Sequence, residues 1–320
     1  MSFDNPKVAV VGAGAMGGLF GGLLKEGGLD VTLLDMAADH VAAIRKNGLR
    51  IVGVGGDRFI PIAATTEARD IKRGDVVLFQ CKAFANEAAA KSVKHLFTGE
   101  TVAISFQNGL GNEEVLAGVL GEGRVIAGLT AQAGLLEAPG VVRNFGNLPT
   151  HIGELTGGLS ERVREIAAAF SRHGLPTTAS GEIKREKWKK LLGNIGLGTI
   201  SAVTDFRSFE IMQVPELQEI VFRLVDEAAA VAKAEGVALN VKEARSVLLK
   251  LADTTGGGTG SSKSSLREDL IRKRRTEIDT IHGTIAKLGR KHGLPTPTLD
   301  TMIALVKGLE QQYLGKERKA

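Results

Sequence analysis

The sequence predicts an α/β domain over residues 1–182 followed by an all-helical domain over residues 183–320. Two observations lead to this prediction. In the first half, short apolar segments rich in β-branched residues alternate with helical patterns, which is typical of a parallel sheet covered on both faces. After about residue 182 the strand-like segments disappear, and the rest of the chain carries helical spacing.

The first half opens with a predicted buried strand at 7–12, KVAVVG, followed by a glycine-rich helix, AMGGLFGGLLKEGG. A second strand at 30–35, DVTLLD, precedes the helix AADHVAAIRKNG. Two more apolar strands are expected at 75–82 and 101–108. Between about 124 and 153, turn residues separate short apolar runs, and this texture predicts hairpin strands that extend the sheet.

The second half contains five segments with helical spacing. These segments are 183–200, 215–235, 240–253, 264–290 and 297–312. The segment TTGGGTGSS at 254–262 is a glycine and serine loop between two of the predicted helices.

Composition and charge restrict the class of protein. Hydrophobic residues make up 43% of the chain and aromatic residues 4%, so the cores must consist mainly of Ala, Val, Leu and Ile. The net charge of +5 suits an anionic small ligand and does not indicate a nucleic-acid partner. With the single cysteine Cys81 and no histidine pair at metal spacing, we expect neither a disulfide framework nor a metal site. Without a signal peptide or a long apolar segment, we expect a cytoplasmic protein that spans no membrane.

A glycine-rich loop follows the first strand. The segment GAGAMG at 12–17 fits G-x-G-x-x-G, and it lies between a predicted strand and a helix, where this pattern binds a dinucleotide. Gly12 allows the tight turn, Gly14 lets the backbone approach a pyrophosphate, and Gly17 lets the helix pack close to the sheet. A turn that serves packing alone is the alternative. The expected cofactor-binding residues of this loop are Gly12, Ala13, Gly14, Ala15, Met16 and Gly17.

The second strand ends in an acidic residue. Asp35 lies about 20 residues beyond the loop, where a carboxylate accepts hydrogen bonds from the ribose hydroxyls. A carboxylate there also repels a 2′-phosphate, and the next residue is Met36 rather than an arginine. This pattern favours NADH over NADPH, with a strand-end turn aspartate as the alternative.

The segment EKWKKLLGNIGLGTIS at 186–201 has two distinct faces when drawn as a helix. Its apolar stripe consists of Trp188, Leu191, Leu192, Ile195 and Thr199. Lys190 and Asn194 lie one turn apart on a different face, with Lys187 nearby and Lys189 pointing elsewhere. By pattern alone this face is either a solvated basic surface, the commoner use of lysine, or a binding site.

The chain resembles the ketopantoate reductases (2-dehydropantoate 2-reductases) over almost all of its 320 residues. The matching segments, in family order, are VVGAGAMGG, CKAFANE, QNGLGNEE, EKWKKLLGN and SSLREDLIRKRRTEIDTIHG. The last three together are quite specific, whereas the first is shared by every Rossmann dehydrogenase. The resemblance implies a dinucleotide-binding Rossmann domain over 1–182. It also implies a helical substrate and dimerisation domain over 183–320, similar to the C-terminal domain of 6-phosphogluconate dehydrogenase.

The same resemblance implies an activity and a set of site residues. The activity is the reduction of 2-dehydropantoate to (R)-pantoate with NADH or NADPH, a step of pantothenate and coenzyme A biosynthesis. Lys190 matches the catalytic lysine that donates a proton to the ketone oxygen, and Glu277 matches the glutamate that contacts the nicotinamide end and tunes the lysine. The implied substrate-binding residues are Asn108, Asn194, Gly198, Ser208, Ser262 and Ser265. The implied further cofactor contacts are Lys82, Asn108, Ala133 and Glu277. From the pattern alone, a surface pair of Glu277 with Lys273 is the alternative.

The chain departs from the family pattern at several polar positions. The second strand ends in LLDMA, without the arginine that usually holds the 2′-phosphate of NADPH. Gly198 and Thr199 replace an asparagine–proline pair, and Ser262 and Ser208 replace amide or other polar contacts. Because lost hydrogen-bond partners relax specificity, a bulkier or more apolar 2-oxo acid is an open alternative. The family contains NAD-dependent D-2-hydroxyacid dehydrogenases of the D-mandelate type that act on such substrates.

A third hypothesis is a dinucleotide-binding regulator without turnover that contacts nucleic acid through IRKRR at 271–275. Against it stand the lack of interleaved aromatics and the acidic neighbours Glu268, Asp269 and Glu277. The retention of both Lys190 and Glu277 also argues against it, because a regulator needs no proton donor. Apolar helical faces late in the chain are consistent with a homodimer.

Overall fold

The computed structural model describes residues 3–146, 148–252 and 264–315, and the chain divides into two compact units. The sheet-containing unit comprises Met1–Gln107 and Gly111–Lys184, and the helical unit comprises Asn108–Leu110 and Arg185–Ala320. The short segment Asn108–Leu110 thus belongs to the helical unit, although the residues on both sides of it belong to the other unit.

The main sheet of the first unit has eight strands in the order β12-β11-β8-β7-β6-β1-β2-β5. Their bounds are β1 Val8–Val11, β2 Val31–Leu34, β5 Ala63–Thr65, β6 Val76–Phe79, β7 Val102–Ser105, β8 Val125–Thr130, β11 Thr150–Gly153 and β12 Thr177–Ala179. The central strand β1 pairs in parallel with β2 on one side and with β6 on the other. This arrangement confirms the predicted parallel sheet.

A second sheet of four strands has the order β4-β3-β10-β9. Its strands are β3 Leu49–Gly53, β4 Arg58–Ile60, β9 Gly134–Ala138 and β10 Val141–Asn144. The expectation that the region from 124 to 153 extends the main sheet holds for β8 and β11 and is wrong for the β9–β10 hairpin. The reason is a long-range pairing, since β10 runs parallel to β3, a strand some ninety residues earlier that the apolar pattern did not reveal.

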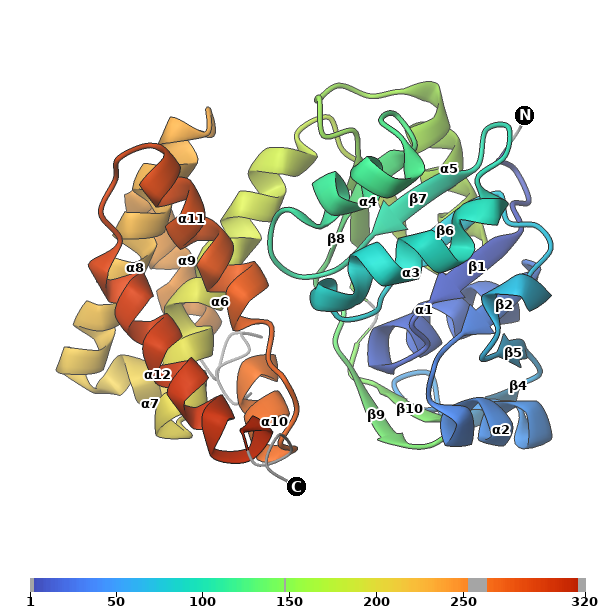
Figure 1. Ribbon diagram of the computed structural model, residues 1–320, viewed down its shortest axis with the longest axis horizontal. Coiled ribbons are helices and arrows are strands. Elements are labelled where there is room, and N and C mark those ends of the chain that lie inside the picture. The colour runs from blue at the N-terminus through green and yellow to red at the C-terminus, as the bar shows by residue number, and fades with distance from the viewer. Residues whose placement is uncertain (1–2, 147, 253–263, 316–320) are drawn as a thin grey trace. The chain divides into compact units, whose positions relative to one another are not determined.

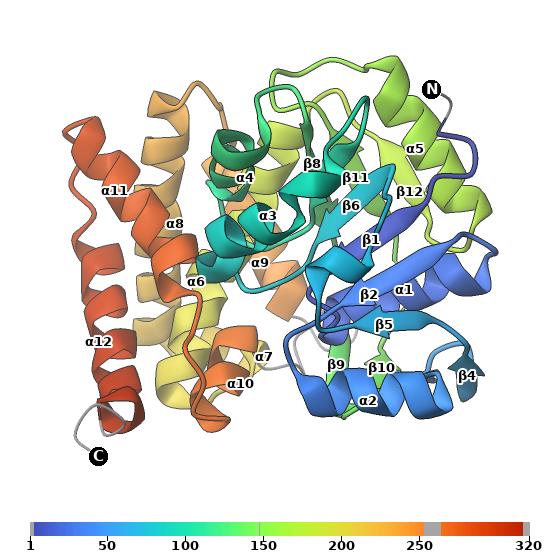
Figure 2. The same ribbon diagram turned by 45° about the vertical axis from the view of Figure 1, so that its right-hand side comes forward.

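Helices cover both faces of the main sheet. The helices of this unit are α1 Ala15–Glu26, α2 Ala38–Asn47, α3 Asn86–Val93, α4 Asn112–Leu120 and α5 Glu161–Arg172, with 3₁₀ turns at Ala68–Asp70, Ala83–Ala85 and Lys94–Leu96. Alternate residues of β1 belong to different apolar clusters, because successive side chains of a strand point to opposite faces. One cluster includes side chains of α1 and α5, and the other includes side chains of α3 and α4. The ribbons of these helices are drawn beside the main sheet in Figures 1 and 2.

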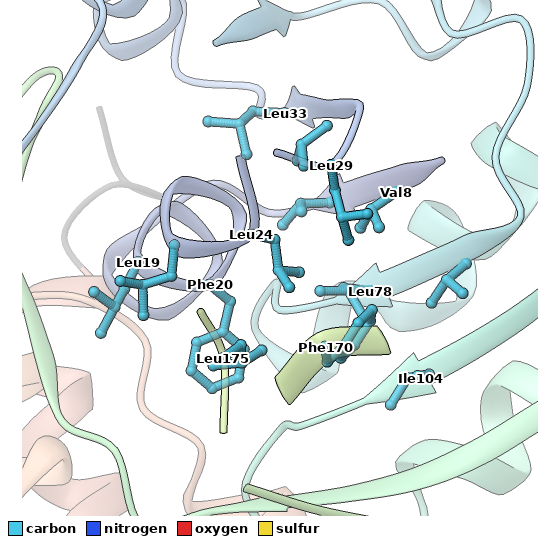
Figure 3. Packing of buried hydrophobic residues seen from close by; sticks show 14 of the residues in the cluster. Val8, Leu19, Phe20, Leu24, Leu29, Leu33, Leu78, Ile104, Phe170 and Leu175 are labelled. Carbon is cyan, nitrogen blue, oxygen red and sulfur yellow. The ribbon is translucent and has the colours of Figure 1, made fainter. Parts of the chain in front are cut away.

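The larger cluster packs α1 onto the strands. Figure 3 shows Leu24 of α1 on the side of Val8 and Leu78 of the sheet, and Phe20 beside Leu175. The ring of Phe20 also meets that of Phe106 edge to face, with centroids 5.2 Å apart. Because this cluster holds α1 on the sheet, it also fixes the position of the loop that begins the helix.

The second unit consists of helices packed around α6. Its helices are α6 Ile183–Thr204, α7 Ser208–Gln213, α8 Pro215–Ala234, α9 Val241–Ala252, α10 Ser265–Ile271, α11 Thr284–Lys291 and α12 Pro297–Leu314. Gly196 lets α6 approach its neighbours closely, since a Cβ there would lie 3.1 Å from Val221 of α8 and 3.5 Å from Leu248 of α9. Within residues 3–146, 148–252 and 264–315, no helix is long and apolar enough to cross a membrane.

The expected continuous helix over 264–290 is wrong, and a break separates α10 from α11. Lys273 adopts a φ of +52°, and the Arg274 N–H donates to the Asp269 carbonyl, which together end α10. The chain then resumes at Thr276, whose N–H donates to Glu310 of α12 at 2.6 Å. A π-helical turn over Asp279–Gly283 leads into α11. Contacts with α12 therefore outweigh the helical periodicity of this segment.

Candidate active site

The glycine loop follows β1 and turns at Gly12, whose φ of +90° lies in the left-handed region that favours glycine. A Cβ on Gly12 would lie 2.5 Å from the backbone nitrogen of Cys81, and a Cβ on Gly17 would lie 1.8 Å from the Gly12 carbonyl oxygen. By contrast, a Cβ on Gly14 would meet no heavy atom within 4 Å. Packing therefore requires glycine at the first and third positions, while the second borders open space.

Helix α1 begins directly after Gly14, so no side chain caps its N-terminus. Its first turn, at Ala15, Met16 and Gly17, contains no acidic residue. The N–H groups at a helix start and the helix dipole favour a bound anion. With open space at Gly14 as well, the loop fits the pyrophosphate of a dinucleotide.

Asp35 follows β2, and its carboxylate lies beside the glycine loop. Oδ2 accepts a hydrogen bond from the Ala13 N–H at 2.7 Å, and Oδ1 accepts one from the Ala37 N–H at 2.9 Å. Each carboxylate oxygen keeps a further lone pair for another donor. The following residue, Met36, is 93% exposed. The structure thus brings the predicted acidic residue and the predicted loop together, over 22 residues of sequence.

His40 of α2 is a loop contact that the sequence did not reveal. Its ring is buried, and Nδ1 accepts a hydrogen bond from the Gly140 N–H at 2.9 Å. The proton of the neutral ring is therefore on Nε2, which donates to the Ala13 carbonyl at 2.9 Å. His40 ties the glycine loop to the turn between β9 and β10. No sequence signal marks this role, because Gly140 is 100 residues away.

A second contact that the sequence did not predict is made by Gln107, which holds the backbone just before Lys82. The buried Gln107 side chain donates to the Cys81 carbonyl and to Asn86 Oδ1, both at 2.6 Å. Asn86 in turn donates to Asn112 at 2.9 Å. This amide network fixes the end of the turn after β6 against the end of β7.

Two further predicted cofactor positions, Lys82 and Ala133, lie in loops of the same unit. Lys82 is half-buried and precedes the 3₁₀ turn Ala83–Ala85. Ala133 is exposed just before β9, and its carbonyl accepts from the Phe145 N–H at 3.1 Å.

In the helical unit, Lys190 lies on the part of α6 where the predicted apolar stripe is buried. Trp188, Leu191 and Ile195 are at most 2% exposed, as the helical pattern predicted. The Lys190 ammonium donates a hydrogen bond to Asn108 Oδ1 at 3.0 Å. Two residues proposed from the resemblance, 82 positions apart in the sequence, are thereby brought together.

The surroundings make the Lys190 ammonium more acidic than an ordinary lysine. Part of the side chain remains accessible, but protein atoms crowd the ammonium and displace its water. This burial, and secondarily the positive charge of Lys187, lowers the pKa of Lys190 to about 8. An amine of this kind exchanges its proton readily near neutral pH.

Asn108 reaches Lys190 because its segment lies against the turn before α11. Gly109 has a φ of +87°, and a Cβ there would lie 2.6 Å from the Thr280 carbonyl oxygen. Leu110 packs against the apolar cluster of the helical unit. The glycine after Asn108 therefore allows a close backbone approach that places the amide beside the lysine.

The residues around the π-helical turn lie close to α6. Asn194 is half-buried one turn after Lys190, and Glu277 is half-buried at the start of the turn. The buried His282 donates from Nε2 to the Ile195 carbonyl at 3.3 Å. Burial lowers the pKa of His282 to about 4, so the ring is neutral near pH 7. π-Helical turns occur frequently at functional sites.

The other predicted substrate residues lie near the end of α6 or at the start of short helices. Gly198 is buried, and its carbonyl accepts from the Ser264 hydroxyl at 2.9 Å. Ser208 begins α7 and Ser265 begins α10, whereas Ser262 lies outside the described residues. In the described part of the chain, Asn194, Ser208 and Ser265 have no hydrogen bond to Lys190.

Among residues 3–146, 148–252 and 264–315, no group of three or more His, Cys, Asp and Glu side chains could hold a metal ion.

Comparison with protein families identifies the family to which this fold belongs. The model described as ketopantoate reductase PanE/ApbA matches residues 8–157, and the model for the C-terminal part of the same family matches residues 182–310. The chain belongs to the ketopantoate reductase family. The α/β unit followed by the helical unit is the arrangement expected of this ketopantoate reductase fold.

Curated relatives within the ketopantoate reductase family are similar over almost their whole length. The 2-dehydropantoate 2-reductase of Halobacterium salinarum is 33% identical and covers 94% of this chain and 98% of its own. That of Pyrococcus horikoshii is 34% identical and covers 95% of this chain and 97% of its own.

Solved structures of similar chains include two kinds of protein. A D-mandelate dehydrogenase bound to NADH and anilino(oxo)acetate is 28% identical, with a TM-score of 0.91 over 96% of this chain and 99% of that one. A ketopantoate reductase from Ralstonia eutropha is 29% identical, with a TM-score of 0.88 over the same shares of the two chains.

Proposed function

We propose that this member of the ketopantoate reductase family reduces 2-dehydropantoate to (R)-pantoate, with NADH as the hydride donor and Lys190 as the proton donor. The observation that carries the proposal is the contact of the acidified Lys190 ammonium with Asn108. Curated relatives with at least 30% identity that bear the name 2-dehydropantoate 2-reductase support the assigned substrate.

Lys190 acts on the oxygen of the substrate ketone. Hydride addition to the carbonyl carbon leaves negative charge on this oxygen, and a neighbouring ammonium stabilises the charge and supplies the proton. The Asn108 carbonyl oxygen accepts a hydrogen bond from one N–H of the ammonium. This bond fixes the orientation of the other two N–H groups, which remain available to the substrate. A donor whose pKa is about 8 loses its proton far more easily than an exposed lysine.

The remaining site residues keep the roles that the resemblance implies. Glu277 joins Lys190 as the second catalytic residue. The proposed substrate-binding residues are Asn108, Asn194, Gly198, Ser208, Ser262 and Ser265. We assign residues 1–182 to a dinucleotide-binding domain and 183–320 to a substrate and dimerisation domain.

The proposed cofactor-binding residues are those of the glycine loop together with Asp35, Lys82, Asn108, Ala133 and Glu277. When bound, the reduced nicotinamide supplies the hydride. The open space at Gly14 and the uncapped start of α1 support pyrophosphate binding at the loop. Asp35 supports a preference for NADH, because its carboxylate lies beside the loop and repels a 2′-phosphate.

A D-2-hydroxyacid dehydrogenase that acts on another branched or aromatic 2-oxo acid is the second candidate. The serines at 208 and 262 and Gly198 favour it, because they stand where the family pattern has polar contacts. The similarity to D-mandelate dehydrogenase does not by itself favour this candidate, because a ketopantoate reductase is similar to nearly the same degree.

One steady-state experiment separates these candidates. Purified protein is mixed with NADH or NADPH and a panel of 2-oxo acids that includes 2-dehydropantoate and phenylglyoxylate, and loss of reduced cofactor is followed by absorbance. We expect the highest kcat/KM for 2-dehydropantoate with NADH. A higher kcat/KM for phenylglyoxylate would establish the second candidate, and turnover with NADPH alone would remove the role given to Asp35. No turnover with any 2-oxo acid would favour a dinucleotide-binding regulator.

We also propose that the protein forms a homodimer through its helical unit. The exposed apolar side chains Val203, Phe206, Leu249, Ile271 and Leu305 support this proposal. Sedimentation equilibrium of the full chain tests it, and a monomer at all concentrations would contradict it.

A further inference from the structure

Helix α6 carries a second buried lysine next to the proposed proton donor. Lys187 is only 5% exposed, although lysine is among the residues least often buried. It precedes Lys190 by three residues, so both side chains leave the same side of the helix about one turn apart.

A neighbouring lysine on the same helix behaves differently. The side chain of Lys189 is 44% exposed, and its ammonium lies 3.6 Å from Glu243 of α9. Helix α6 thus directs Lys189 to solvent and an acidic partner, and it directs Lys187 and Lys190 toward protein. Burial of two ammonium groups so close together is costly, and such an arrangement is more typical of a functional site than of a solvated surface.

The ammonium groups of Lys187 and Lys190 lie in surroundings with little water. Like charges repel, so the charge of Lys187 disfavours the charged form of Lys190. After burial, the positive charge of Lys187 is the cause that lowers the pKa of Lys190. Protein surroundings screen such repulsion less than water does.

Titratable groups near this part of α6 include its own half-buried Glu186, which precedes Lys187, and several groups on the elements packed around it. Glu243 of α9 pairs with Lys189, and His282 is neutral because burial holds its pKa at about 4. The segment Asn108–Leu110 contributes the neutral amide of Asn108. The turn before α11 also carries Glu277, the proposed second catalytic residue.

Acidic side chains of the neighbouring helices are held by arginines or by backbone N–H groups, as Glu227 of α8 is by the N–H groups of Thr298 and Leu299. On α10, Glu268 lies 2.8 Å from Arg267, and Asp269 lies 2.9 Å from Arg274. On α8, Asp226 pairs with Arg245 of α9.

We propose that Lys187 is a positioning residue that acts on the reaction through Lys190, because its ammonium, one turn away on α6, promotes proton release from the proton donor. This inference rests on the proposed function of Lys190. In the reduction, an N–H bond of the Lys190 ammonium breaks, and an O–H bond forms on the oxygen that has received the electron pair of the hydride. The neutral amine that remains no longer repels Lys187, and it regains a proton from water after the product leaves.

Two measurements on the same variants test the inference. The variants are Lys187→Met, Lys187→Gln, Lys187→Arg and, as a matched control on the same helix, Lys189→Gln. The titration of Lys190 is followed directly by NMR of protein labelled with ¹³C-lysine, with the Lys190 signal assigned by its loss in Lys190→Met. The pH profile of kcat/KM for 2-oxo acid reduction is measured in parallel.

Removal of the Lys187 charge should raise the Lys190 titration midpoint by about one pH unit, and the alkaline limb of kcat/KM should move up with it. Lys187→Arg should keep both midpoints near those of the unchanged protein, because it keeps the charge. Lys189→Gln should move neither. A packing defect alone would lower the rate without raising the titration midpoint of Lys190. Two neutral variants, Lys187→Met and Lys187→Gln, are used so that the test remains possible if one of them does not fold.

An unchanged or lowered Lys190 midpoint in both neutral variants, or an equal rise in Lys189→Gln, would overturn the role of Lys187. The proposed function is tested separately by Lys190→Ala. If that variant is inactive while the Lys187 variants leave the midpoint unmoved, the function stands and this inference fails. If Lys190→Ala keeps full turnover, the proton-donor role fails, even where the NMR shift shows that the two charges interact.

Discussion

The Nζ atom of Lys190 lies 3.0 Å from Oδ1 of Asn108, so the amide at the start of the segment Asn108–Leu110 holds the Lys190 ammonium of α6. The contact depends on Gly109, which lets the segment pack against the Thr280 carbonyl. An amine positioned in this way and depleted of water is suited to donate a proton.

Lys190→Ala should reduce kcat by a factor on the order of 100 or more, because the developing oxyanion loses both its proton source and its stabilising charge. Dinucleotide affinity, measured by fluorescence titration with NADH, should remain unchanged. Lys189→Ala serves as the control, since that side chain is exposed on the same helix. Comparable turnover in Lys190→Ala and the control would exclude Lys190 as the proton donor.

The pH dependence of kcat/KM should follow the lowered pKa of Lys190. Reduction requires Lys190 in its protonated form, so kcat/KM should fall as pH rises through the pKa of about 8. The reverse oxidation requires the neutral amine, so its kcat/KM should rise over the same range. Stopped-flow or steady-state rates between pH 6 and about 10 measure both limbs. An alkaline limb near the ordinary lysine value would contradict the burial of the ammonium.

Two glycine variants separate packing from cofactor binding. Gly17→Ala forces a Cβ within 1.8 Å of the Gly12 carbonyl oxygen and should destabilise the protein by about 1–3 kcal/mol. Gly14→Ala introduces no contact within 4 Å, so its midpoint of thermal unfolding should equal that of the unchanged protein. It should nevertheless weaken NADH binding roughly tenfold, about 1.4 kcal/mol. Thermal unfolding and NADH titration are the measurements. Unchanged NADH affinity in Gly14→Ala would remove the pyrophosphate from this loop.

Asp35→Asn should change the choice of cofactor. The neutral amide no longer repels a 2′-phosphate and accepts ribose hydroxyls more weakly, so the ratio of kcat/KM for NADH over NADPH should fall by a factor on the order of ten. Asp39→Asn is the matched control, since Asp39 is exposed in the first turn of α2. An equal ratio in both variants would show that Asp35 serves the Ala13 and Ala37 N–H groups alone.

Protonation of His282 should destabilise the helical unit in mild acid. The folded pKa of about 4 lies below the ordinary value of 6.5, so the unfolded chain binds more protons between these values. Stability should therefore be full above pH 6.5 and fall by roughly 3 kcal/mol as the pH drops to about 4.

Denaturant titrations monitored by the single tryptophan, the buried Trp188 of α6, measure this effect in the helical unit. His282→Gln keeps a donor for the Ile195 carbonyl and cannot titrate, so its acid-dependent loss should be smaller by that amount. Parallel pH dependences in the two proteins would show that another group is responsible.

Much of the local structure follows from the sequence pattern. Alternating apolar strands and helices predicted the parallel sheet, and the buried stripe of Trp188, Leu191 and Ile195 was predicted from a period of 3.6 residues. The spacing predicted Asp35 at the end of the second strand, and the structure shows Asp35 just after β2, hydrogen-bonded to Ala13 of the glycine loop. These features depend on backbone geometry over short distances, which residue type and spacing specify.

Longer-range features escaped the sequence pattern. The β9–β10 hairpin joins a second sheet through β3, and the predicted helix over 264–290 breaks where Thr276 binds Glu310 of α12. His40 reaches the glycine loop and the β9–β10 turn at once. In each case a tertiary contact outweighs the local preference of the segment.

By itself, the sequence determined the division into an α/β half and a helical half, the glycine turn before α1 and the family to which the chain belongs. The tertiary structure alone decided that Asn108 holds Lys190 and that Lys187 is buried beside it. Periodicity specifies which side of a helix is apolar, because that depends on neighbours a few residues away. Which distant group comes to lie against the other side depends on how separate elements pack, and this also decides the hydration and acidity of an amine.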